Sequence, residues 1–94
     1  MTPEEEVRRA GRAKQIVNDE IFTSAVAAIR EAMLMGIRHS AFKDAELREK
    51  LCQRYALLED LVGQIETVME TGELAQEEIR RKSLLEQAKE IWNG

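Results

Sequence analysis

An apolar stripe between residues 51 and 69 is the feature that most constrains the fold of this chain. Its members follow one another in steps of four and three, which is the spacing of one face of an α-helix. They are Leu51, Tyr55, Leu58, Val62, Ile65 and Met69. The stripe is widened by Leu47, Leu61 and Val68, and a wide stripe indicates packing against more than one neighbour rather than the narrow seam of a simple coiled coil.

The stripe predicts a long helix over about residues 44–71. Gly72 then stands where glycine commonly follows the C-terminus of a helix. Asp44 and Ser40 are both candidates for the residue that caps the start of this helix. The helix would therefore be a separate element, preceded by a connection around His39 and followed by a break.

Three further segments carry helical patterns, and no segment alternates like a strand. The first, residues 3–17, opens on Thr2 and Pro3 with acidic residues in its first turn. The second, residues 19–38, restarts after a polar stretch in which Asn18 can cap. Its apolar residues are Ile21, Phe22, Ala25, Val26, Ile29, Met33 and Ile37. The third covers about residues 74–92.

These patterns together predict an all-α fold. We expect an elongated helical hairpin of helices 19–38 and 44–71, with additional N- and C-terminal helices. A chain of 94 residues has room for one small domain, so we expect residues 1–94 to form a single helical domain.

Composition excludes several classes of protein. Cys52 is the single cysteine and His39 the single histidine, so a disulfide within the chain and a zinc site of cysteines and histidines are both excluded. No apolar run approaches the length that spans a bilayer, which predicts no membrane partner. The first residues have neither the basic nor the apolar region of a signal peptide, and we expect a cytoplasmic protein.

The sequence contains few candidate catalytic residues. His39 falls in a connection, where a capping or surface role is expected, and Cys52 beside Leu51 is expected to be a small buried thiol. The glycines are scattered rather than gathered in a phosphate-binding loop. We therefore expect no catalytic residue, no cofactor, no metal ligand and no enzymatic activity.

Charge is unevenly distributed along a chain of net charge −4. Residues 59–78 form an acidic block, for which a solvated helix face is the ordinary explanation and a basic partner surface the alternative. Short basic clusters occur at residues 8–14 and 80–82. An acidic chain without an aromatic stacking platform is not expected to bind nucleic acid as a monomer, although a ring of subunits could concentrate a basic face.

Six residues are predicted to contact other proteins. The long helix exceeds what helix 19–38 can cover, so part of its stripe should be buried by another chain: Leu58, Val62, Ile65 and Met69. Leu85 and Trp92 share a face near the C-terminus. Docking of this face on a partner and packing within the chain are both open, and the polar stretch 80–83 favours the partner.

The order of residues between Ile16 and Gln76 carries a family resemblance. The resemblance begins with residues 16–22, Ala25-Val26 and residues 29–31. After a short connection it continues with residues 44–51 and a leucine-rich helix that ends at Thr71-Gly72. This arrangement, which covers about two-thirds of the chain, resembles the small helical proteins encoded among tailed-bacteriophage morphogenesis genes. The resemblance implies a role in the virion or its assembly and brings no catalytic residues. The implied partners are other phage structural proteins or further copies of the chain, in the host cytoplasm during assembly and then in the virion.

Three functions follow as hypotheses. The first is a non-enzymatic phage structural or assembly protein that works as a helical protein–protein interaction module. The second is a DNA-packaging subunit of the small-terminase type, which ring formation and salt-sensitive DNA binding would reveal. The third is an acidic phage-encoded inhibitor of a host protein, which capture of a host enzyme would reveal.

Overall fold

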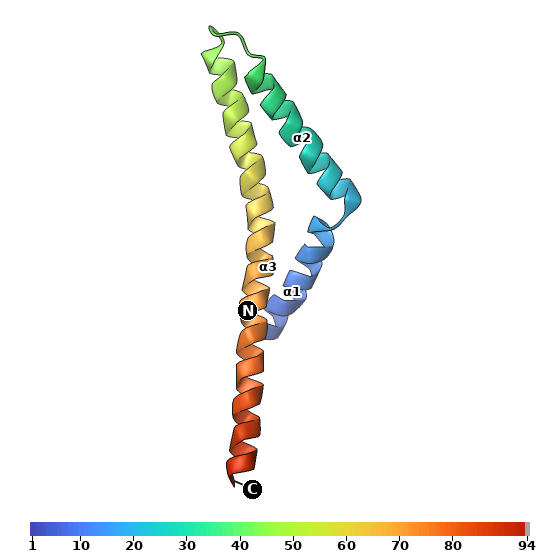
Figure 1. Ribbon diagram of the computed structural model, residues 1–94, viewed down its shortest axis with the longest axis vertical. Coiled ribbons are helices and arrows are strands. Elements are labelled where there is room, and N and C mark those ends of the chain that lie inside the picture. The colour runs from blue at the N-terminus through green and yellow to red at the C-terminus, as the bar shows by residue number, and fades with distance from the viewer. Residues whose placement is uncertain (94) are drawn as a thin grey trace. The chain divides into compact units, whose positions relative to one another are not determined.

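The computed structural model describes residues 1–93, which form three α-helices and no strand. They are α1 (Pro3–Val17), α2 (Glu20–Arg38) and α3 (Ala45–Asn93), shown in Figure 1. The predicted all-α fold is confirmed. Contacts divide the chain into two units, of which unit 1 joins residues 1–15 to the part of α3 from Glu66 onward and unit 2 comprises residues 16–65. The single domain stays a prediction, and each unit is described by itself.

Helix α1 begins where the sequence indicates. Thr2 Oγ1 accepts a hydrogen bond from the Glu5 amide at 3.2 Å, and the Thr2 carbonyl accepts one from the Glu6 amide at 3.0 Å. The first turn also carries acidic side chains, which suit the positive end of the helix dipole. The predicted helix over residues 3–17 is confirmed.

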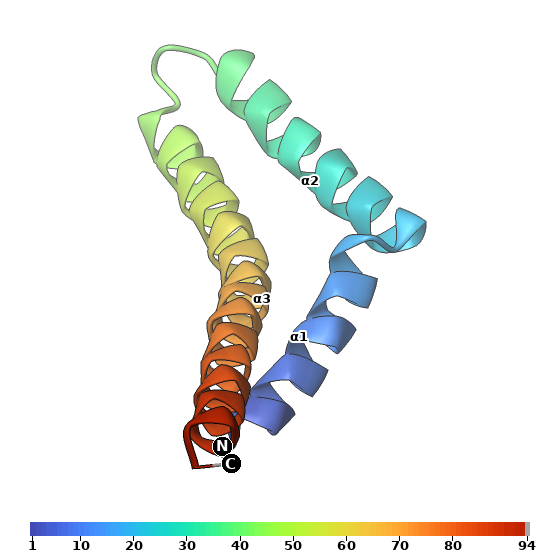
Figure 2. The ribbon, with the colours of Figure 1, turned by 60° about the horizontal axis from the view of Figure 1, so that its bottom comes forward.

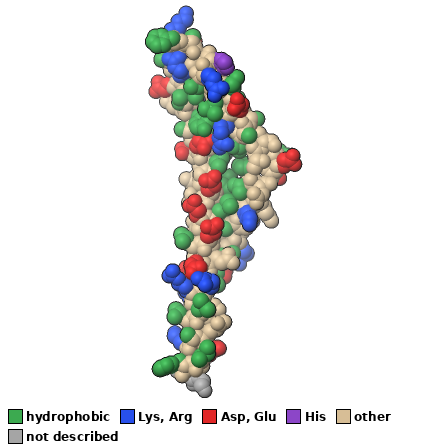
Figure 3. Space-filling view, in the orientation of Figure 1, with side chains coloured by type: hydrophobic (Ala, Val, Ile, Leu, Met, Phe, Trp, Pro, Cys, Tyr) green, Lys and Arg blue, Asp and Glu red, His purple; other side chains and the backbone are tan. Residues whose placement is uncertain are grey.

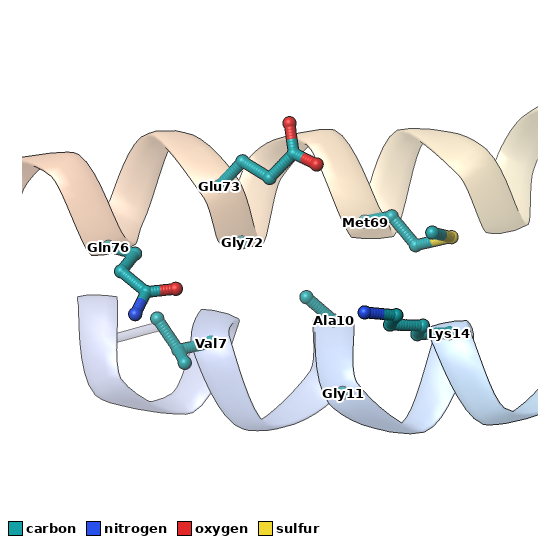
Figure 4. Close-up of a pocket in the computed structure, with 8 residues that line it drawn as sticks. All are labelled: Val7, Ala10, Gly11, Lys14, Met69, Gly72, Glu73 and Gln76. Carbon is teal, nitrogen blue, oxygen red and sulfur yellow. The ribbon is translucent and has the colours of Figure 1, made fainter.

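Unit 1 is held together by a close approach of α1 to α3. A Cβ built on Gly72 would overlap the Cβ of Ala10 and lie 3.1 Å from the carbonyl oxygen of Glu6. Figure 4 shows Ala10 of α1 opposite Gly72 of α3. The buried side chains of this unit are small, with Ala13 at 5% and Ala75 at 3% exposed. Small residues let two helices approach closely but remove little apolar area from water.

The predicted end of the long helix before Gly72 is wrong. Helix α3 runs from Ala45 to Asn93, so residues 74–92 form no separate helix. A glycine that ends a helix usually adopts a positive φ, and no described glycine does so. Gly72 lies within the helix, and Ala10 occupies the place that a side chain at residue 72 would take.

Helix α2 begins with a cap one residue later than predicted. The chain leaves the helical conformation at residues 18 and 19, which confirms a restart. The cap is Asp19 rather than Asn18, because the Asp19 carboxylate accepts a hydrogen bond from the Phe22 amide at 2.9 Å.

In unit 2, α2 packs against the first part of α3. A Cβ built on Gly36 would lie 2.9 Å from Leu51 Cδ1, and Arg30 Nε donates to Glu59 Oε1 at 2.7 Å. Residues later in α2 thus contact residues earlier in α3, so the two segments run antiparallel. The hydrogen bond to Glu59 is the main cause that raises the pKa of Arg30 above its ordinary value.

Figure 2 shows the connection between α2 and α3 as a loop. The side chain of Arg48 makes three hydrogen bonds across it. Arg48 donates to Ser40 Oγ at 3.2 Å, to the Ala41 carbonyl at 2.5 Å and to the Phe42 carbonyl at 2.9 Å. The Ser40 hydroxyl in turn donates to the Ile37 carbonyl at 2.8 Å, so this predicted cap of the long helix instead contacts the end of α2. Helix α3 starts directly after Asp44, the other predicted cap.

The six residues of the predicted apolar stripe are less exposed than two of the residues that widen it. Leu51 is buried, and the other five members of the 51–69 stripe are half-buried. Of the residues that widen it, Leu47 is 48% and Leu61 is 54% exposed. Cys52 is exposed rather than buried as expected, because a helix turns about 100° between Leu51 and its neighbour.

We expect Gly72→Ala to destabilise the protein. Alanine favours a helix over glycine by about 1 kcal/mol, but the added methyl must displace Ala10, and overpacking costs about 1–3 kcal/mol. Urea denaturation should show a net loss in the free energy of unfolding. The double variant Ala10→Gly with Gly72→Ala should recover part of it.

Gly63→Ala is the matched control on the same helix. A Cβ built there meets nothing within 4 Å, so the variant should gain about 1 kcal/mol from helix propensity alone. An equal gain in Gly72→Ala would contradict the close approach of Ala10.

Candidate protein-interaction surface

The C-terminal part of α3 carries an uncovered apolar face. Every residue from Arg80 to Trp92 is exposed, and Trp92 itself is 89% exposed. Apolar side chains lie at the surface along this end of the helix (Figure 3). We define the C-terminal apolar face as Leu84, Leu85, Ala88, Ile91 and Trp92. It includes both predicted contact residues of this region, and neither packs within unit 1.

Three members of this face, Leu84, Ala88 and Ile91, were not among the predicted contact residues. Leu84 is 51% and Ile91 is 83% exposed. The signal was present, since Leu84, Ala88 and Ile91 follow one another in steps of four and three.

Ion pairs within the helix hold the polar stretch before this face. Arg80 Nη2 lies 2.6 Å from Glu77 Oε1, and Lys82 Nζ lies 3.5 Å from Glu78 Oε1. Pairs at these spacings support a helix that has no tertiary cover. The hydrogen bond from Arg80 lowers the pKa of Glu77, and the same bond raises the pKa of Arg80.

The other four predicted contact residues are half-buried within the chain. Leu58, Val62 and Ile65 belong to unit 2, on the stripe of α3 that includes Leu51. Met69 belongs to unit 1 and lines a groove beside Gly72. Partial burial by another chain stays a prediction for all four.

A shallow groove of about 360 Å³ lies beside the crossing of α1 and α3. Its lining combines apolar and small residues with the side chains of Lys14, Glu73 and Gln76. In Figure 4, Gln76 points toward α1 while Glu73 points away from it. The titratable side chains of the lining are those of Lys14 and Glu73. The complete lining is Val7, Ala10, Gly11, Lys14, Met69, Gly72, Glu73 and Gln76.

The part of the chain that the structure describes has neither a candidate metal site nor a candidate membrane span. Within residues 1–93, no three side chains of His, Cys, Asp or Glu are grouped so that they could hold a metal ion. No helix in this range is both long enough and apolar enough to cross a membrane. His39 stands at the C-terminal cap of α2, where its amide donates to the Met35 carbonyl at 3.0 Å.

Comparison with protein-family models, with curated proteins and with solved structures gives no match.

Helix order near Glu77 should depend on pH. Because Arg80 lowers the pKa of Glu77, the carboxylate stabilises the folded helix above its ordinary pKa of about 4.3. That contribution is lost as the pH falls through the lower pKa of the folded state. We expect amide exchange of residues 77–82 to accelerate on acidification more in the parent than in Glu77→Gln. Equal acceleration in the two proteins would contradict a role for this ion pair.

Proposed function

We propose that this chain is a non-enzymatic helical interaction module, whose C-terminal apolar face binds another protein. The exposure of Trp92, at 89%, carries the proposal. Tryptophan is enriched at the centres of protein interfaces, because it buries a large apolar area and its N–H still finds a partner. The face extends over about two and a half helical turns, and an exposed apolar face of this kind commonly marks an interaction site.

The sparse core of the chain supports the same proposal. The buried apolar residues among those described are Ala13, Leu51 and Ala75, and no side chain is completely buried. In unit 1 and in unit 2, the packing joins two helical segments. A pair of helices has outer faces that only a further element or another chain can cover. The predicted hairpin is proposed here in the form of α2 and the first part of α3.

The proposed biological setting is tailed-phage assembly, in the host cytoplasm and then in the virion. It is supported by the resemblance of residues 16–76 to small helical proteins of phage morphogenesis. An interaction module without catalytic chemistry suits that setting. Mass spectrometry of purified particles from the source phage would test it, since a structural component should be present in a constant ratio to the capsid protein. Absence from particles and from assembly intermediates would contradict this setting.

Truncation of Trp92 should weaken association with the partner. The indole is the single tryptophan of the chain, so its fluorescence reports directly on this face. We expect emission to shift to shorter wavelength as protein associates. Trp92→Ala should weaken association about 10- to 100-fold, as for a central interface residue. Sedimentation and circular dichroism should show weakened association with helix content retained.

Phe42→Ala is the matched control, because Phe42 is also an exposed aromatic residue, at 97%, and lies in unit 2. It should leave association through the C-terminal face unchanged. If Trp92→Ala and Phe42→Ala associate as well as the parent, the proposed interaction surface is wrong.

A further inference from the structure

Helix α2 is apolar over more of its circumference than one neighbouring helix covers. Because successive residues are rotated by about 100°, its apolar residues fill a continuous sector of about 200° that contains no polar side chain. Around the helix, this sector extends from Met35 through Ile21, Ile29 and Phe22 to Ile37. An apolar stripe of about 100° is typical of a helix that packs on one side. The sector of α2 therefore has the width that suits two neighbours.

In unit 2, α3 lies along one half of this sector. Gly36 meets Leu51, because a Cβ built on Gly36 would lie 2.9 Å from Leu51 Cδ1. Arg30, which borders the sector beside Ile37, reaches Glu59 at 2.7 Å. The apolar side chains between these two contacts are half-buried, except for Ile29, and no residue of α2 is buried. The half-buried ones are Phe22, Val26, Met33 and Ile37.

The other half of the sector is uncovered. Its residues follow one another in steps of four and three, so they form one stripe along α2. All of them are exposed within the part of the chain that the structure describes, and Ile21 is 80% exposed. We define the outer stripe of α2 as Ile21, Ala25, Ala28, Ala32 and Met35. Removal of this stripe from water would stabilise any assembly that covers it.

Charged residues border the outer stripe on the side away from α3. Glu20 lies in the first turn of α2, Arg38 in the last turn and Glu31 between them. All three are exposed, and they lie within about 20° of one another around the helix. The ion pairs among residues 1–93 join other side chains. This side of α2 therefore has an acidic start and a basic end, whose charges are not paired within the described residues.

Two copies of the outer stripe match in shape when their α2 helices run antiparallel. In the register that sets Ala25 opposite Ala32 of the second copy, Ile21 comes within one residue of the second copy's Met35. One residue is about 1.5 Å along the helix. In the same register Ala28 comes within one residue of the second copy's Ala28, beside the two-fold axis. The larger side chains therefore meet at the two ends, and the alanines in the middle let the helices approach closely.

The charges match in the same antiparallel register. A two-fold axis places the charged sides of both helices on the same side of the pair, where Glu20 comes within one residue of the second copy's Arg38. This contact occurs twice, once at each end. The two Glu31 residues are separated by about 7.5 Å along the helix axis. In a parallel pair, the charged side of one helix would instead lie beside the apolar side of the other, so Glu20 and Arg38 would have no partner.

From this self-complementarity we propose that the outer stripe of α2 binds a second copy of this chain, as an antiparallel pair of α2 helices about a two-fold axis. Each copy uses the same surface, so the contact is closed and assembly through it stops at a dimer. The C-terminal apolar face takes no part, since it belongs to unit 1 whereas α2 belongs to unit 2. The inference therefore goes beyond the proposed function, and the dimer carries two copies of that face.

Ala28→Glu tests the contact beside the two-fold axis. Residue 28 is exposed in the single chain, so the change should leave the fold of each copy intact. In the dimer, the two new carboxylates would face each other in a contact from which water is excluded, and like charges placed together oppose association. We expect the dimer to be at least about 10-fold weaker in sedimentation velocity. Circular dichroism should show unchanged helix content.

Ala27→Glu is the matched control. It makes the same substitution at the neighbouring residue, which is also exposed but is rotated by about 100° from Ala28, outside the outer stripe. It should dimerise like the parent. Trp92→Ala should also dimerise like the parent, because Trp92 lies in unit 1 and is exposed on a different helix.

Cross-linking tests the antiparallel direction. Cys52, the single cysteine, is first replaced in the variant Cys52→Ser, and Ile21→Cys or Met35→Cys is then added to it. A mixture of the two cysteine variants should form a covalent dimer with a short thiol cross-linker, because residues 21 and 35 of different copies lie side by side. Neither variant should cross-link alone, since its two cysteines would be about 20 Å apart along the helix axis.

Several outcomes would overturn the proposal: a parent that stays monomeric at high concentration, Ala28→Glu that dimerises like the parent, and Ile21→Cys that cross-links to itself rather than to Met35→Cys. Loss of the dimer in Trp92→Ala would assign self-association to the C-terminal apolar face and would also overturn it. Failure here is distinguishable from failure of the proposed function. A monomeric parent whose Trp92 fluorescence shifts on binding a different virion protein would retain the interaction module and exclude the α2 dimer.

Discussion

The contact between Ala10 and Gly72 is the constraint on which unit 1 depends. It brings the backbones of α1 and α3 so close that no side chain larger than hydrogen fits at residue 72. Such closeness requires small neighbours, and Ala13 and Ala75 are the buried residues beside it. A crossing built from alanine and glycine removes little apolar area from water. Several larger apolar side chains of this unit, Leu74, Leu85 and Trp92 among them, are exposed.

Local signals in the sequence predicted the start of α1 correctly and the start of α2 to within one residue, because helix caps are local interactions. Thr2 caps α1 through an amide three residues away, and Asp19 caps α2 in the same way. The stripe from Leu51 to Met69 lies on one side of α3, where Leu51 is buried and the other members are half-buried. The residues that widen this stripe were predicted to pack against a second neighbour. Leu47 and Leu61 are exposed, at 48% and 54%, whereas Val68 is half-buried.

Neighbouring residues in the sequence do not show whether Gly72 ends a helix or lies within one. A glycine after an amphipathic helix has the same appearance whether it ends the helix or lets another helix approach. The decision comes from Ala10, which is distant in sequence, and from the pairs of Glu77 and Glu78 that carry the helix through its polar stretch. In the sequence, these ion pairs correspond to acidic and basic residues three or four positions apart. Leu85 and Trp92 were identified because their face needs no knowledge of the rest of the fold.

Arg48 gives the connection between α2 and α3 a further property, which concerns the order of folding. Its three acceptors lie six to eight residues away in the sequence. Loops of this length close within about 10–100 ns, far faster than contacts between distant segments form. The turn can therefore assemble before Arg30 reaches Glu59, and α2 and α3 can then pair progressively away from it. The Ala10 contact with Gly72 closes the longest loop and is expected to form last.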